Sequence, residues 1–122
     1  MKISNSALLV STIFAALASG QVFAGDADFT LVNRTGYTLR EIYVSPSNKE
    51  EWGKDRMGNN VLENGKSRLF KFSDKSSCEQ DLKVVFEDDA SEETWEDIDL
   101  CELSKITIKY NRKTREVFAD AK

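Results

Sequence analysis

Asp81-Leu-Lys-Val-Val-Phe-Glu87 carries the clearest structural pattern of this chain. Leu82, Val84 and Phe86 alternate with polar neighbours, and Val85 is the one apolar residue that falls on the other face. Apolar residues at every second position predict a β-strand that is buried on one side only. We therefore expect a sheet whose inner face covers a core.

The next segment, 94–100, predicts the partner of this strand. An acidic turn at 88–93 separates the two segments, which is the arrangement of a β-hairpin. In a regular strand, Ile98 and Leu100 lie on one side and Trp95 on the other.

Further strand patterns appear on both sides of this hairpin. Residues 28–35 and 38–45 are rich in β-branched and aromatic side chains and flank Gly36, which predicts a second hairpin. Strands are also predicted at 68–73, after an Asn64-Gly65 turn, and at 105–111 and 116–119. Six or seven short strands predict an all-β fold, a small antiparallel β-sandwich, with a partly open barrel as the alternative.

The first 24 residues have the pattern of a secretory signal peptide. Lys2 precedes an apolar run at 7–17, and Val22-Phe23-Ala24 places suitable residues before a cut after Ala24. The run is shorter than a membrane span, and no Cys follows the cut to carry a lipid. We expect residues 25–122 to form one domain, exported to the bacterial periplasm or secreted, without a stable membrane anchor.

Cys78 and Cys101 lie just outside the two ends of the predicted 81–100 hairpin. Export would bring them into an oxidising compartment, where paired thiols form disulfides. A redox or metal-binding pair would need closer spacing or further ligands. We therefore predict a structural disulfide that closes the open end of the hairpin, and no metal site on these residues.

The composition excludes several function classes. The chain of 122 residues has no His, which removes Ser-His and Cys-His nucleophile pairs and the commonest transition-metal ligand. Its net charge of −4 and lack of a basic stripe argue against nucleic acid as a partner. We expect a protein that is not an enzyme and needs no cofactor.

The segment 45–60 is the most unusual part of the predicted domain. It begins Ser45-Pro-Ser-Asn-Lys-Glu-Glu-Trp-Gly-Lys-Asp-Arg-Met-Gly58, and long loops on rigid β scaffolds often carry binding. Two interpretations of Trp52 remain open: it plugs one end of the core, or it forms the rim of a binding site. Asp55 correspondingly either accepts bonds from loop amides or contacts a ligand, and Arg56 is the third candidate contact.

The chain resembles small secreted β-sandwich proteins, mostly bacterial and uncharacterised. The resemblance rests on a Ser-Pro-Ser and Trp-Gly loop followed by a paired-Cys pattern. The matching positions are Ser45, Pro46, Ser47, Trp52, Gly53, Asp55, Gly58, Leu62, Gly65, Cys78, Asp81, Leu82, Val84, Phe86, Trp95, Asp99, Leu100 and Cys101. This loop is more basic than is usual in the group, since it carries Lys49, Lys54 and Arg56.

A second candidate surface is acidic and centres on Asp88, Asp89, Glu92 and Glu93. Carboxylates of a turn can bind Ca²⁺, although the ordered spacing of an EF-hand is missing. They can also repel other sheet edges or bind a basic partner.

The leading hypothesis is an exported binding module that uses the 45–60 loop, with Trp52, Asp55 and Arg56, for an unidentified protein or small-molecule ligand. The alternative is an inhibitor or immunity-type protein that uses the acidic surface. A Ca²⁺-binding structural protein comes third.

Overall fold

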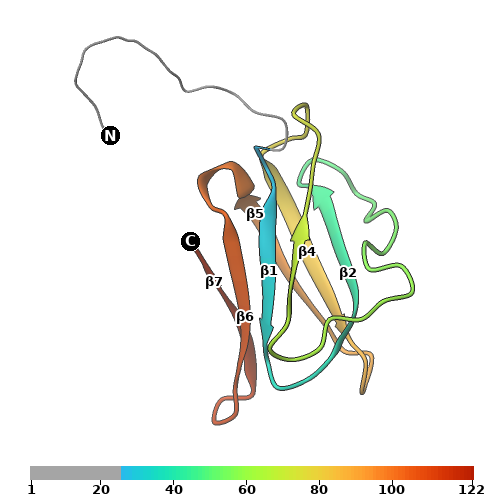
Figure 1. Cartoon of the computed structure of the whole chain (residues 1–122), viewed down its shortest axis with the longest axis vertical. Helices are drawn as coiled ribbons and strands as arrows, with labels where there is room; N and C mark the ends of the chain where they lie inside the picture. Colours follow the sequence, from blue (N-terminus) through green and yellow to red (C-terminus); the bar gives the residue numbers. More distant parts are fainter. Residues whose placement is uncertain (1–25) are drawn as a thin grey trace, which may run out of the picture.

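The computed structural model describes residues 26–122, which form two β-sheets packed face to face (Figure 1). The expected signal peptide, 1–24, lies outside the described residues. Across 26–122, no helix has the length and apolar character needed to cross a membrane. The elements are β1 (Phe29–Arg34), β2 (Leu39–Pro46), β3 (Ser67–Phe70), β4 (Glu79–Phe86), β5 (Glu92–Asp99), the 3-10 helix η1 (Leu100–Glu102), β6 (Lys105–Asn111) and β7 (Glu116–Ala121).

The strand order confirms the predicted all-β sandwich. One sheet has the order β3-β1-β6-β7 and the other has the order β2-β4-β5. Four of the five strand pairs are antiparallel, and β1 and β6 are parallel. A parallel pair requires a long crossover, and here the chain builds the whole three-stranded sheet between β1 and β6.

The alternation of β4 is confirmed by its burial. Leu82, Val84 and Phe86 are buried between the sheets, whereas Lys83 lies on the outer face of the three-stranded sheet. The facing sheet contributes buried residues from β1 and β6 with the same period of two. The side chains shared by this core include Phe29, Leu31, Leu39, Ile42, Val44, Leu62, Phe70, Leu100, Ile106 and Ile108.

The predicted hairpin of β4 and β5 is present, and the disulfide closes it. Cys78 and Cys101 are bonded, with their Cα atoms 5.2 Å apart. The Leu100 amide also donates to the Cys78 carbonyl at 2.9 Å, so covalent and hydrogen bonds both join the open end.

The prediction that Trp95 lies on the opposite side of β5 from Ile98 was wrong, because β5 contains a bulge. Gln80 pairs with Ile98 and Leu82 pairs with Trp95, so two residues of β5 lie opposite Asp81. One of them, Asp97, has a φ of 57° and donates its amide to Asp81 Oδ1 at 2.9 Å. The extra residue reverses the alternation, so both Trp95 and Ile98 pack against the core.

The predicted hairpin around Gly36 was also wrong: β1 and β2 belong to different sheets. The fully buried Asn33 holds the crossing between them. Its amide donates to the Tyr37 carbonyl at 2.7 Å and to the Leu62 carbonyl at 2.9 Å, and its Oδ1 accepts from Thr35. One side chain therefore joins the β1–β2 connection to a segment about thirty residues further along the chain.

Replacing both Cys78 and Cys101 with Ala should lower the free energy of unfolding by about 3 kcal/mol, because the bond limits the unfolded chain. Urea unfolding would measure this loss, and hydrogen exchange should be fastest at the freed end of β4 and β5. Reduced wild-type protein serves as the control for the substitutions. An unchanged unfolding midpoint in both samples would contradict this role.

Candidate functional site

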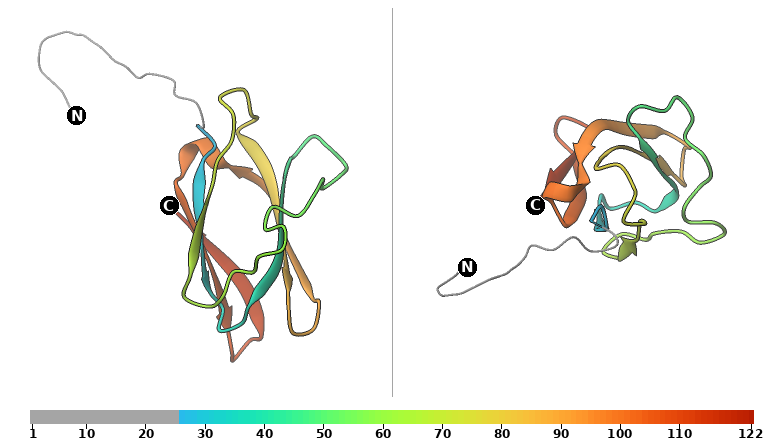
Figure 2. Two further views of the ribbon diagram at one scale, coloured as in Figure 1. Left: turned by 45° about the vertical axis from the view of Figure 1, so that its right-hand side comes forward. Right: turned by 90° about the horizontal axis from the view of Figure 1, so that it is seen from above.

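The loop from 47 to 60 runs along the free edge of β2 (Figure 2). The Asp55 carboxylate accepts from the Ile42 amide and from the Met57 amide, each at 2.9 Å. The Arg56 amide donates to the Ile42 carbonyl at 2.8 Å. The loop therefore occupies both backbone hydrogen-bonding groups of Ile42 on the edge strand, which shields this part of the edge from other chains.

Met57 and Arg56 both fix the loop to the sandwich. Met57 is 2% exposed and lies in the core. The Arg56 guanidinium lies 4.6 Å from the centre of the Phe72 ring and donates to the Val44 carbonyl at 3.4 Å. Burial lowers the pKa of Arg56. Arg56 thus holds the loop in place as well as lining the surface beside it.

Trp52 lies on the outer face of the three-stranded sheet. Its ring is 6.5 Å from the ring of Tyr43, and Lys83 Nζ is 5.1 Å from the Trp52 ring centre. Trp52 is half-buried and is not part of the core cluster, in which Met57 is the residue contributed by this loop. Trp52 was expected either to plug one end of the core or to form the rim of a binding site, and its position agrees with a rim.

A groove of about 920 Å³ lies between this loop and β3. Trp52 and Phe70 are among its lining residues, and both acidic members, Glu51 and Asp55, belong to the loop. Asp55 is already engaged by two amides. The five basic residues that line it are Lys49, Lys54, Arg56, Arg68 and Lys71.

The three loop residues selected from the sequence all line this groove, but with different roles. Asp55 and Arg56 chiefly hold the loop on β2, whereas Trp52 is available at the rim. Sequence reasoning missed Arg68 and Lys71, which come from β3 and the residues after it. Their only sequence signal was positive charge, because the position of β3 beside the loop is a tertiary feature.

The structure does not bring the four predicted acidic residues together on one surface. Asp88 and Asp89 lie at the tip between β4 and β5. Glu92 and Glu93 are neighbours in β5 and therefore point to opposite faces. Asp89 Oδ1 accepts from the Ser91 amide and hydroxyl, and these bonds lower the pKa of Asp89.

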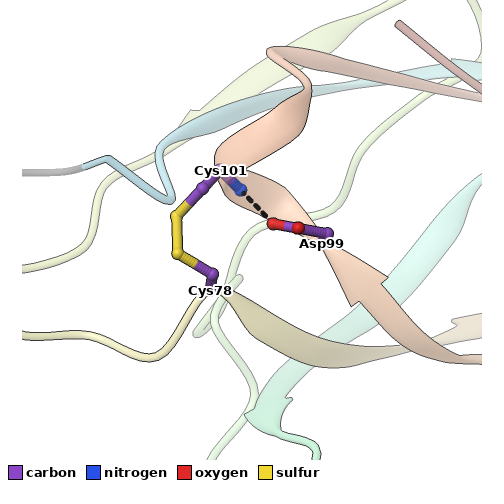
Figure 3. Close-up of side chains that lie close together, drawn as sticks. All are labelled: Cys78, Asp99 and Cys101. Carbon is purple, nitrogen blue, oxygen red and sulfur yellow. Dashed lines mark hydrogen bonds between the residues drawn. A yellow bond between two sulfur atoms is a disulfide. The ribbon is translucent and has the colours of Figure 1, made fainter. Parts of the chain in front are cut away.

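Within residues 26–122, one group of potential metal-ligating side chains comes together: Cys78, Asp99 and Cys101. Figure 3 shows that the two sulfur atoms are bonded to each other and that Asp99 accepts from the Cys101 amide. Asp99 is the N-cap of η1, which this bond stabilises. The group therefore stabilises the open end of the β4–β5 hairpin, which the disulfide joins.

Comparison with known proteins supports the fold. No family model and no curated protein matches the chain. A solved structure described as "NMR structure of the protein from Eubacterium rectale" is similar, with a TM-score of 0.53 and 19% sequence identity. The match covers 77% of this chain and 85% of that chain. At this identity, the likeness shows a shared fold.

Asp55→Ala should lower the free energy of unfolding by about 2 kcal/mol, because two amides lose their acceptor. Asp55→Asn is the matched control, since one carbonyl oxygen can still accept both bonds, and it should cost less than about 1 kcal/mol. Urea unfolding of the two variants would measure the difference. Equal losses would show that the charge of Asp55, and not its geometry, stabilises the loop.

A hydrogen bond beside Trp52 should make stability depend on alkaline pH. Tyr43 donates to Glu41 at 2.6 Å, which raises the pKa of Tyr43 from 10.0 to about 12. The same bond lowers the pKa of Glu41. Because the pKa of Tyr43 is higher in the folded state, its stabilising contribution is complete below pH 10.0 and is lost as pH rises through about 12.

Tyr43→Phe should therefore remove the absorbance change at 295 nm that appears near pH 12 in the wild type. The variant should also lose less stability than the wild type between pH 10.0 and about 12. A wild-type protein in which all tyrosines ionise below pH 11 would contradict this assignment.

Proposed function

We propose that this protein is an exported binding protein whose groove, between the 47–60 loop and β3, takes an extended anionic ligand. The observation that carries the proposal is the concentration of charge. Five basic residues line one groove in a chain with a net charge of −4, and one of the two acidic residues there is held by backbone amides.

The shape of the groove supports an extended ligand. Its volume of about 920 Å³ is near the upper end of the range for small-molecule sites, and it is open to solvent along the loop. Lys49, Lys54 and Lys71 are exposed at its margins, where long-range attraction would speed association with an anion. Trp52 offers an aromatic face beside these charges.

The proposal assigns binding and not catalysis. The chain has no His, and the pKa shifts found around the groove are those of groups used to hold the loop and the outer face of the sheet. Export follows from the signal peptide pattern of the first 24 residues. Together these features favour a carrier or adhesive domain in the cell envelope or outside it.

The test is a titration of Trp fluorescence with hexagalacturonate and with a hexaglutamate peptide, beside a neutral hexasaccharide. Saturable binding of an anionic ligand, absent with the neutral one, would support the proposal. Affinity should fall steeply with salt because several charge contacts are exposed. No binding of either anion at low salt would overturn it.

The double substitution Lys54→Gln, Lys71→Gln should weaken that binding by up to about thirtyfold, since each lost exposed charge contact contributes up to roughly 1 kcal/mol. The control is Lys105→Gln, Lys113→Gln, which removes the same charge from exposed positions outside the groove. An equal effect of the two double variants would indicate non-specific attraction and contradict a site in the groove.

A further inference from the structure

A second cavity lies at the end of the sandwich opposite the disulfide, where the connections after β1, β4 and β6 gather (lower end of Figure 1). Its volume is about 270 Å³, close to the lower limit for small-molecule sites. The cavity is separate from the groove proposed above and shares none of its lining residues.

Three aromatic side chains form its walls. Tyr37 meets Phe86 edge to face, with ring centres 6.4 Å apart and planes at 90°. Tyr37 also meets Tyr110, with centres 5.7 Å apart and planes at 76°. All three aromatic residues line one small cavity, and aromatic side chains gathered around such a space are what recognises quaternary ammonium ligands. Tyr37 is 40% exposed, so this space is reached from solvent.

Two carboxylates complete the cavity. Asp88 and Asp89 line it from the β4–β5 tip, and its lining includes no Lys or Arg. Asp89 is held in one orientation by Ser91, whereas the Asp88 carboxylate makes no hydrogen bond or ion pair within residues 26–122. Arg112 lies near Gly36 at the neighbouring turns, outside the cavity lining.

We propose that this cavity binds a small methylated ammonium cation of the choline type. The faces of aromatic rings attract a cation, and the methyl groups of a quaternary ammonium fill an apolar space that a hydrated metal ion does not. The two exposed carboxylates of Asp88 and Asp89 add negative charge, which attracts the cation. Val117 supplies apolar contact on the side of the cavity formed by β7.

The experiment is a two-dimensional NMR titration of the isotope-labelled protein with choline chloride, with sodium chloride at equal ionic strength as the reference. Saturable shifts are expected at Tyr37, Phe86 and Tyr110. The neutral isostere 3,3-dimethyl-1-butanol, which has the same shape without the charge, should bind about tenfold more weakly.

Two variants test the residues. Tyr110→Leu should weaken choline binding about tenfold, and Asp88→Asn, at an exposed turn that tolerates substitution, should weaken it roughly threefold. Lys54→Gln, Lys71→Gln in the groove should leave choline binding unchanged. The proposal is overturned if choline produces no saturable shifts or if the isostere binds equally well. It is also overturned if the two single variants, Asp88→Asn and Tyr110→Leu, are both folded and both bind choline as tightly as the wild type does.

Discussion

The central position of β4 is the constraint on which the rest of this structure depends. It has strand neighbours on both sides, β2 and β5, and its inner face supplies Leu82, Val84 and Phe86 to the core. Cys78 immediately precedes it and ties its first end to the residues after β5. With one strand fixed in this way, both neighbours must pair in a register that turns their apolar residues toward the same core.

Because β4 lies in the centre of its sheet, β2 is an edge strand. An edge strand exposes unpaired amides and carbonyls, and here the 47–60 loop satisfies Ile42 through the Asp55 carboxylate and the Arg56 amide. The same contact places Trp52 on the outer face and leaves a groove between the loop and β3. Protection of the edge and formation of the groove therefore come from one loop conformation, in which Asp55 is a structural residue.

Charge is distributed unevenly over this small domain. The groove collects Lys49, Lys54 and Lys71 together with two arginines, whereas the carboxylates of Asp88 and Asp89 lie beside an aromatic cavity at one end. Each feature is formed by segments from both sheets, so neither exists in an isolated hairpin. This separation of opposite charges is the physical basis of the two proposals, an anionic ligand in the groove and a methylated ammonium cation in the cavity.

The sequence by itself determined the strands, the hairpin of β4 and β5 and the closing disulfide, because alternation and short turns are local properties. Tertiary structure alone decided that β1 and β2 separate, since Asn33 takes the Leu62 carbonyl as a partner. It also decided the inward turn of Trp95, through a bulge held by the Asp81 side chain. The groove and the aromatic cavity also depend on contacts between distant segments. The loop residues of the groove were recognisable in the sequence, but their roles depended on the edge of β2 and the position of β3.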